Sequence, residues 1–299
     1  MNTFYDCVKS RGIEIIKDEP LKNHTTFKIG GNAKYFVLPA DEDEIISVLE
    51  EAEKHNERVL VLGNGSNMLI SDNGFDGAII YIGEKMSGIS FIDETTVKAQ
   101  AGALLVSVCR KAQAQSLGGM ERLYGIPGSV GGGLYMNAGA YGSEMKDVVL
   151  SAEYIDNNKQ LCNIKLDDMD LSYRHSFFSD KKCIITSVTF RLKKSDKAEI
   201  KALMDEYMQK RRDKQPVEYP SAGSVFKRPE GYFAGALIEQ SGLKGRKIGS
   251  AQVSEKHAGF IINIGGATQS DVSELIGLCQ KTVFEKTGVK LETEIKCIE

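Results

Sequence analysis

The stretch from Gly125 to Gly142 limits what this chain can fold into more than any other part of the sequence. Seven of its eighteen residues are glycine. Glycine adopts positive φ without a Cβ clash, and it lets backbone N–H groups come close to a ligand. Successive N–H groups in such turns form concave anion sites that suit a pyrophosphate. The alternative interpretation is a glycine-rich surface loop that binds nothing.

A second glycine cluster favours the ligand-binding interpretation. The apolar run 58–63 predicts a short buried strand that leads directly into the turn Asn64-Gly-Ser-Asn67. Neither cluster is a Rossmann fingerprint, and neither is a Walker loop. Two such loops in one chain indicate a dinucleotide that is held at its pyrophosphate in some other way.

Composition excludes several classes of function. The 299 residues, 41% of them hydrophobic, can form two or three domains with a sizeable core. A net charge of −3 gives no basic surface for nucleic acid or for a membrane. Met1–Pro20 has no continuous apolar segment, so we expect no signal peptide and a cytoplasmic protein. The six cysteines and four histidines match no metal-site spacing, so we expect reduced thiols and no metal.

Hydrophobic periodicity predicts three blocks, at 1–94, 95–194 and 195–299, and the last of these has α+β character. Asp41 and Ser195 are the expected N-caps of the helices that follow them. Helices are predicted at 41–55, 103–115, 195–214, 233–240 and 271–287. Strands are predicted at 58–63, 78–82, 95–100, 148–155, 183–192, 257–264 and 289–298.

Three further segments carry residues suited to chemistry. Ser224 is followed by Lys227 and Arg228, and a hydroxyl with two cations at one turn suits an anionic substrate. Arg174 lies among aromatic residues, and its planar guanidinium binds oxyanions with two hydrogen bonds. Glu294 lies in a segment in which side chains alternate between two faces. This alternation alone predicts that Glu294 is a solvated residue of a strand. A solvated polar loop and an ordinary core-edge arginine are the alternatives for the first two.

Six ordered motifs run through the chain. They are Gly63-Asn-Gly-Ser-Asn67, Ile126-Pro-Gly-Ser-Val-Gly-Gly132, Met136-Asn-Ala-Gly-Ala-Tyr-Gly142, Tyr173-Arg-His-Ser-Phe177, Ala222-Gly-Ser-Val-Phe-Lys227 and Leu291-Glu-Thr-Glu294. In this order they resemble the UDP-N-acetylenolpyruvoylglucosamine reductase family, from about His24 to Ile298. The resemblance implies an α+β chain with a two-part FAD-binding domain of the vanillyl-alcohol oxidase type, followed by a substrate-binding domain.

The resemblance also implies roles for individual residues. Arg174, Ser224 and Glu294 match the catalytic residues, with Ser224 as the proton donor. Lys214, Lys227 and Arg228 fall where the family contacts its UDP-sugar. The positions that match FAD contacts are Gly63, Asn64, Gly65, Ser66, Asn67, Gly125, Ile126, Pro127, Gly128, Ser129, Gly131, Gly132, Asn137, Ala138, Gly139 and Arg211. The connection from Arg191 to Ser195 is too short for the tyrosine loop of the larger subclass, so this chain resembles the compact subclass.

The implied activity uses two small-molecule substrates, NADPH and UDP-N-acetylglucosamine enolpyruvate, with FAD as the cofactor and UDP-N-acetylmuramate as the product. No nucleic-acid, membrane or obligate protein partner is implied. Arg174 suits the charge that builds on the substrate carboxylate, whereas Glu294 suits it only in a neutral form. Three other functions stay open, namely an FAD oxidase of the same superfamily, a flavin-binding electron-transfer subunit and a nucleotide-binding protein with no enzymatic activity.

Overall fold

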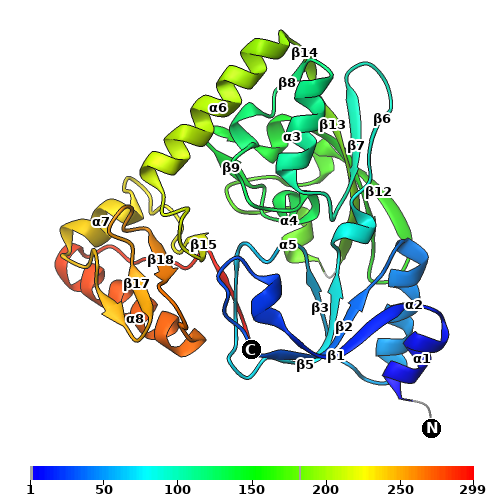
Figure 1. The fold of residues 1–299 in the computed structure, drawn as a ribbon, viewed down its shortest axis with the longest axis horizontal. Helices are drawn as coiled ribbons and strands as arrows, with labels where there is room; N and C mark the ends of the chain where they lie inside the picture. Colours follow the sequence, from blue (N-terminus) through cyan, green and yellow to red (C-terminus); the bar gives the residue numbers. More distant parts are fainter. Residues whose placement is uncertain (1–2, 182) are drawn as a thin grey trace. The chain divides into compact units, whose positions relative to one another are not determined.

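Helices and strands are mixed along the whole chain in the computed structural model, which describes residues 3–181 and 183–299 (Figure 1). The predicted α+β character is confirmed. The α-helices are α1 (Phe4–Ser10), α2 (Glu42–Lys54), α3 (Leu105–Ala114), α4 (Val130–Tyr135), α5 (Phe177–Asp180), α6 (Lys197–Lys214), α7 (Ala234–Gln240) and α8 (Gln269–Thr287).

The strands fall into several sheets. Those of the first half are β1 (Glu14–Pro20), β2 (Asn32–Leu38), β3 (Val59–Leu62), β4 (Met68–Ile70), β5 (Phe75–Tyr81), β6 (Ile89–Phe91), β7 (Thr96–Gln100), β8 (Leu117–Gly118), β9 (Gly139–Ala140), β10 (Ser143–Glu144) and β11 (Val149–Ile155). The others are β12 (Leu161–Lys165), β13 (Ile184–Arg191), β14 (Lys193–Lys194), β15 (Ser221–Ser224), β16 (Lys247–Ile248), β17 (Ala251–Val253), β18 (Phe260–Asn263) and β19 (Lys296–Ile298). Short 3-10 helices lie at Leu21–His24, Glu84–Met86, Glu121–Leu123, Met145–Asp147 and Leu166–Asp168.

The chain divides into two units, and each is discontinuous in sequence. Unit 1 comprises 1–17, 35–64 and 77–210, and unit 2 comprises 18–34, 65–76 and 211–299. Each unit contains its own cluster of buried apolar side chains. The three-block division expected from the sequence stays a prediction, and unit 2 draws two segments from the first of those blocks.

Unit 1 contains the five-stranded sheet β12-β11-β13-β7-β6, in which every neighbouring pair is antiparallel. Strands β3 and β5 run parallel, with Val59 opposite Ala78, in the sheet ordered β1-β2-β5-β3. Helix α4 packs against β13, and α1 packs against α2 (Figure 1). Asp41 is confirmed as the N-cap of α2, because its carboxylate accepts a hydrogen bond from the Glu44 N–H.

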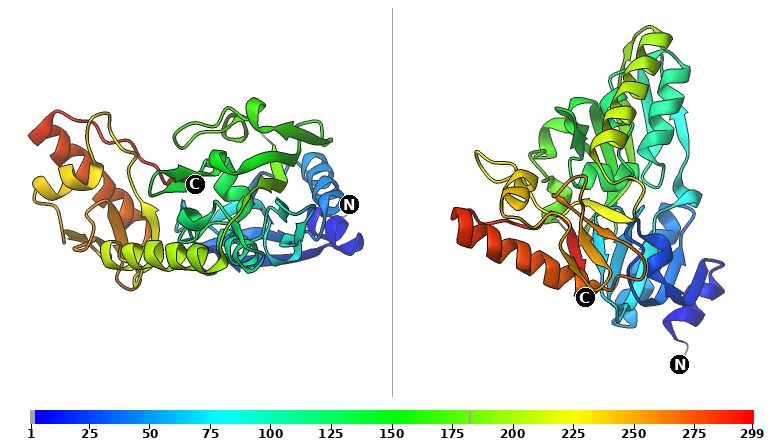
Figure 2. Two further views of the ribbon diagram at one scale, coloured as in Figure 1. Left: turned by 90° about the horizontal axis from the view of Figure 1, so that it is seen from above. Right: turned by 60° about the vertical axis from the view of Figure 1, so that its left-hand side comes forward.

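Unit 2 is built on the antiparallel sheet β15-β18-β17-β16. Helix α8 packs along β16 and β17 and beside α7 (Figure 2). Thr268 caps the start of α8, and Gly288 ends it with φ of 73°. A parallel pair joins β4 to β19, with Leu69 opposite Cys297. This pair ties the segment after the Asn64–Asn67 turn to the end of the chain.

Three sequence predictions of local structure were wrong. The cap of α6 is Asp196 rather than Ser195, because the Asp196 carboxylate accepts from the N–H groups of Ala198 and Glu199. The last strand covers Lys296–Ile298 instead of 289–298, because the backbone before it turns aside to pair with residues 225–227. The strand at 257–264 is shortened to Phe260–Asn263, because the Phe260 N–H closes a turn onto the His257 carbonyl.

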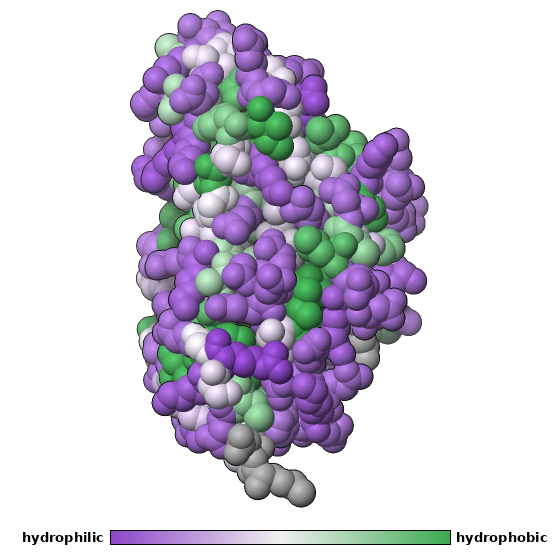
Figure 3. All heavy atoms as spheres, turned by 90° about the vertical axis from the view of Figure 1, so that its right-hand side faces the viewer, coloured by the Kyte–Doolittle hydropathy of each residue, from purple (hydrophilic) through white to green (hydrophobic). Residues whose placement is uncertain are grey.

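The face of the molecule in Figure 3 is mostly hydrophilic, with small hydrophobic patches separated from one another. Within the described residues, no helix combines the length and the apolar character that a membrane crossing requires.

Candidate active site

The two glycine clusters meet in unit 1 just after strand β3. The Asn64 side-chain N–H donates to the Pro127 carbonyl at 2.5 Å. Gly63 lies so close to the second loop that an added Cβ would sit 2.4 Å from Ser129 Oγ. A side chain at position 63 would therefore push the two loops apart, which explains the glycine there.

The start of helix α4 is fixed by short backbone contacts. The Val130 N–H donates to the Ala103 carbonyl at 2.7 Å, and the Gly131 N–H donates to the Ala101 carbonyl at 2.9 Å. A Cβ on Gly131 would lie 2.8 Å from Ala101 Cβ, so only glycine fits. Ser129 caps the helix, because its hydroxyl accepts from the Gly132 N–H at 3.3 Å. The exposed Gly132 thus lies on a rigid backbone turn.

Asn137 holds the far end of the glycine-rich stretch. It is fully buried, with φ of 40°. Its side-chain amide donates to Glu144 Oε2 and to the Ser172 carbonyl, and its Oδ1 accepts from the Lys146 N–H. These bonds use both amide hydrogens, so the side chain stabilises the loop, and any contact with a cofactor would come from its backbone. Ala138 and Gly139 follow, half-buried, at the start of the β9 and β10 pair.

Arg174 lies in a tight turn next to this loop. Ser172 and His175 exchange two backbone hydrogen bonds of 3.2 Å, and Arg174 between them has φ of 57°. A left-handed conformation costs a non-glycine residue roughly 1–3 kcal/mol, and such strain is often found at functional sites. The guanidinium is half-buried and lies 5.1 Å from the centroid of the exposed Tyr173 ring. The turn therefore fixes the direction in which Arg174 extends.

Two bonds attach the Arg174 turn to the glycine-rich stretch. One is the bond from Asn137 to the Ser172 carbonyl. In the other, the Ser176 hydroxyl donates to the Tyr135 carbonyl at 2.7 Å, and Ser176 is fully buried. Next to Arg174, the His175 ring N–H donates a hydrogen bond to the Asp180 carboxylate, which raises the pKa of His175. The structure thus places the predicted cofactor loop and Arg174 in one hydrogen-bonded part of unit 1.

In unit 2, the rest of the first turn meets the end of the chain. Gly65 has φ of 57°, and an added Cβ would lie 2.2 Å from the His24 carbonyl oxygen. The Asn67 side-chain N–H donates to the Glu294 carbonyl at 3.3 Å, and the Lys296 N–H donates to the Asn67 carbonyl at 2.9 Å. Asn67 therefore positions the backbone of Glu294.

Ser224 and Glu294 lie on neighbouring segments of unit 2. The Glu294 N–H donates to the Val225 carbonyl at 2.7 Å, and Phe226 forms an antiparallel bridge with Thr293. Both Ser224 and Glu294 are half-buried. The register of β15 shifts before Ser224, where Gly223 has φ of 76° and would place a Cβ in open space. Bulges of this kind redirect a side chain and are over-represented near active sites.

Of the predicted cations, Lys214 and Arg228 are exposed, whereas Arg211 and Lys227 are half-buried like the catalytic candidates. Lys227 Nζ lies 3.4 Å from the exposed Glu292 carboxylate, and Arg228 lies 4.2 Å from the Phe233 ring centroid. Arg211 and Lys214 are in the last turn of α6. All four cations are in unit 2, so an anionic ligand bound to this unit would have four cations in the same unit.

Sequence reasoning missed Thr26. Its hydroxyl donates to the Ser221 carbonyl at 2.7 Å, and its N–H donates to the Gly65 carbonyl at 3.3 Å. It therefore connects the first turn to strand β15, which leads to Ser224. No sequence signal could have found this contact, because the partners lie 195 residues apart and threonine is common in turns.

Comparison with known proteins matches both parts of the chain. Residues 33–164 match the FAD binding domain model, and residues 215–298 match the model for the C-terminal domain of UDP-N-acetylenolpyruvoylglucosamine reductase. A reductase of that name from Caldicellulosiruptor saccharolyticus is 48% identical over 288 residues, covering 96% of this chain and 92% of that protein.

This chain belongs to the UDP-N-acetylenolpyruvoylglucosamine reductase family.

Two further comparisons support this assignment. The reductase from Caldicellulosiruptor bescii is 49% identical over 293 residues, covering 97% of this chain and 93% of that protein. The crystal structure of the Thermus caldophilus reductase has a TM-score of 0.80 and 32% identity, covering 96% of this chain and 99% of that one.

Part of the fold also occurs outside the reductase family. A Physcomitrella patens BBE-like protein superposes with a TM-score of 0.52 at 16% identity over 64% of this chain and 44% of that one, which is a likeness of fold alone. The predicted FAD-binding domain, followed by the C-terminal domain of the reductase family, is confirmed by the two family models. In this member of the reductase family, β13 and α6 are separated only by residues 192–196, with the two-residue β14 between them. The connection is as short as the sequence predicted.

Proposed function

We infer that this protein reduces the enolpyruvyl group of UDP-N-acetylglucosamine enolpyruvate to give UDP-N-acetylmuramate, with NADPH as reductant and FAD as cofactor. This reaction supplies a peptidoglycan precursor. The observation that carries the inference is the match at 48% identity along 96% of the chain to a reductase of this name. Both the FAD-binding model and the reductase C-terminal model match in the expected order.

The residues of unit 1 fit FAD. The turn at Gly63 and the start of α4 pack backbone against backbone, with no space for side chains at Gly63 or Gly131. Such an arrangement fixes the backbone of both turns before the ligand arrives, which lowers the cost of binding a cofactor against them. We propose that these turns contact FAD. For Gly65–Asn67 and Arg211, in unit 2, the proposed FAD contact rests on the family resemblance alone.

FAD held by these residues would supply the chemistry of hydride transfer from NADPH to the terminal vinyl carbon of the substrate. Negative charge then builds on the adjacent carbon and on the carboxylate attached to it. We propose that Arg174 binds this carboxylate, because a guanidinium stays protonated and donates two parallel hydrogen bonds. The strained turn at 172–175 holds the side chain in one direction, which lowers the reorganisation needed during the reaction.

We propose that Ser224 delivers the proton that completes the reduction. A serine hydroxyl is a weak acid near neutral pH, but a carbanion-like carbon is basic enough to take its proton. Gly223, in the bulge before it, leaves open space in which a substrate can approach. Glu294 is held by its backbone to Val225 and Asn67, and we propose that it acts in its neutral form beside the developing charge.

We propose that Lys214, Lys227 and Arg228 contact the UDP group, since phosphates attract exposed cations. NADPH and UDP-sugars are cytoplasmic metabolites, and we propose that the enzyme works in the cytoplasm.

The test combines a rate and a product. The purified protein is supplied with NADPH, with and without UDP-N-acetylglucosamine enolpyruvate, and NADPH consumption is followed together with the mass of the sugar product. The proposal predicts consumption that depends on the UDP-sugar and a product two hydrogens heavier. NADPH consumption that depends only on oxygen, with the UDP-sugar unchanged, would instead identify an oxidase and refute the proposed substrate.

A further inference from the structure

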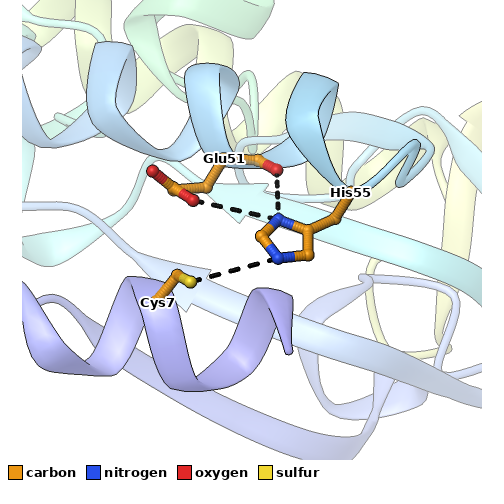
Figure 4. A group of neighbouring side chains, drawn as sticks. All are labelled: Cys7, Glu51 and His55. Carbon is orange, nitrogen blue, oxygen red and sulfur yellow. Dashed lines mark hydrogen bonds and ion pairs between the residues drawn. The ribbon is translucent and has the colours of Figure 1, made fainter. Parts of the chain in front are cut away.

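A cluster of three possible metal ligands lies in unit 1 outside the proposed reaction machinery (Figure 4). Cys7 lies in helix α1 and Glu51 in helix α2, and His55 is the C-cap residue of α2. One ligand atom from each residue can be chosen so that all three lie within 4.8 Å of one another. In Figure 4 the thiol and the carboxylate both point toward the imidazole ring.

The imidazole of His55 is oriented as it would be in a metal site. Nδ1 lies 2.9 Å from the Glu51 carbonyl oxygen, which can only accept, so Nδ1 carries the proton and donates. In the neutral imidazole, Nε2 then carries the lone pair, and it faces Cys7 Sγ at 4.0 Å. Histidines that bind metals almost always donate their other ring N–H to a carbonyl or carboxylate, which fixes the tautomer in this way.

Two cations pair with one oxygen of the Glu51 carboxylate and leave the other oxygen directed at the cluster. Arg11 and Lys54 both contact Oε1, at 2.5 and 2.9 Å. The second oxygen, Oε2, lies 3.8 Å from His55 Nδ1. The carboxylate is 6% exposed and is paired with the two cations. It is therefore a fixed anion on the wall of the cluster.

The separation of the sulfur and the imidazole nitrogen is close to that in a tetrahedral zinc site. Zn–S and Zn–N bonds of about 2.3 and 2.0–2.1 Å at a tetrahedral angle place the two ligand atoms about 3.5 Å apart. The observed separation of 4.0 Å between Sγ and Nε2 needs an inward shift of about half an ångström. A thiolate, an imidazole and a carboxylate form a donor set that zinc accepts, whereas calcium and magnesium prefer oxygen alone.

We propose that Cys7, His55 and Glu51 bind a zinc-type divalent cation, which holds helix α1 against helix α2. Sγ, Nε2 and a Glu51 carboxylate oxygen supply three ligands, and a water supplies the fourth. On binding, the Cys7 thiol gives its proton to solvent and the sulfur binds as thiolate, since only the deprotonated form is a ligand.

The competing interpretation is a hydrogen-bond network that only caps helix α2 and docks α1 on it. In that case the Cys7 thiol donates to His55 Nε2, and Glu51 does no more than pair with Arg11 and Lys54. The two interpretations differ in one respect. In a metal site, Cys7→Ser removes a ligand of the metal. In a hydrogen-bond network, the same substitution changes only a weak hydrogen bond.

The experiment uses untagged FAD-loaded protein, dialysed against increasing zinc, with bound metal measured after each step. The proposal predicts one zinc per chain, with X-ray absorption showing one sulfur at about 2.3 Å and lighter ligands at about 2.0–2.1 Å. Zinc should also raise the melting temperature. Cys7→Ser and His55→Gln should each weaken binding by more than about 100-fold, because removal of outer-shell residues already costs 10–100-fold.

Cys162→Ser is the matched control, since Cys162 is a half-buried free thiol of the same unit that is outside the cluster. It should bind zinc as the parent does. FAD content and turnover of all three variants should equal those of the parent, which verifies that they are folded and separates this proposal from the proposed activity. Zinc binding that is absent from the parent, or that is unchanged in both Cys7→Ser and His55→Gln, would overturn the proposal.

Discussion

Replacement of Gly63 by alanine tests how the two glycine clusters hold each other. The added Cβ would lie 2.4 Å from Ser129 Oγ but 3.5 Å from Ser129 Cβ, so the clash involves the hydroxyl oxygen alone. If the hydroxyl rotates away, it gives up its bond with the Gly132 N–H, and loss of such a cap costs about 1 kcal/mol. If the turn moves instead, overpacking costs about 1–3 kcal/mol. We therefore expect Gly63→Ala to lower the free energy of unfolding by about 1–3 kcal/mol.

The double variant sharpens this test. Ser129→Ala alone should cost about 1 kcal/mol, the value of the cap. With the oxygen removed, the alanine at 63 makes only ordinary contact, so Gly63→Ala with Ser129→Ala should be no less stable than Ser129→Ala alone. The two changes are then coupled by about 1–3 kcal/mol, the whole cost of Gly63→Ala. Urea unfolding of protein stripped of FAD measures this without any change in cofactor affinity.

Gly277→Ala in α8 is the control for the urea experiment. No atom would lie within 4 Å of its Cβ, so this variant should gain about 0.5–1 kcal/mol. Additive losses in the Gly63 and Ser129 double variant would refute the predicted clash.

Four further predictions concern the proposed site and the pH dependence of stability. Ser224→Ala should leave flavin reduction by NADPH unchanged in stopped flow and slow reoxidation by the UDP-sugar about 100-fold; reoxidation at the parent rate would exclude Ser224 as proton donor. Arg174→Ala should slow the same step while FAD stays bound, and release of FAD on gel filtration would point to a structural role instead. Glu294→Gln should retain more turnover than Glu294→Ala if the neutral form acts, and equal losses would argue against that form. Burial holds the pKa of His257 below its usual value, so the unfolded protein takes up a proton at this residue at a higher pH than the folded protein does. The contribution of neutral His257 to stability should therefore be complete above about pH 6.5 and decline below it. Melting temperatures from pH 7.5 to 5.5 should fall less in His257→Asn, and parallel curves would contradict this.

The sequence predicted those helices and strands whose periodicity and end signals lie in neighbouring residues. Helix α8 begins near the predicted 271 and ends at Gly288, because periodicity and a left-handed glycine are both readable from neighbouring residues. The segment 289–295 was predicted as strand because its side chains alternate. It pairs instead with residues 225–227, more than 60 positions earlier, and alternation alone does not reveal such a partner.

Long-range contacts also explain what the sequence did not show about the site. The parallel pair of β4 with β19 brings 65–76 into unit 2, and no local signal links strands more than 200 residues apart. Ser224 and Glu294 were expected from the family resemblance, whereas their closeness rests on the Glu294–Val225 hydrogen bond. By contrast, Glu51 and His55 are four residues apart at the end of α2, so helix geometry alone predicts that they are close, whereas Cys7 comes from a different helix.

An anaerobic absorbance titration of the purified protein tests the central claim most directly. NADPH is added until the oxidised flavin band is lost, and UDP-N-acetylglucosamine enolpyruvate or buffer is then added to separate samples. Our account predicts that the oxidised band returns with the UDP-sugar and stays absent with buffer. A band that is lost but does not return would contradict the proposed substrate, and a protein with no flavin band after reconstitution with FAD would contradict the cofactor as well.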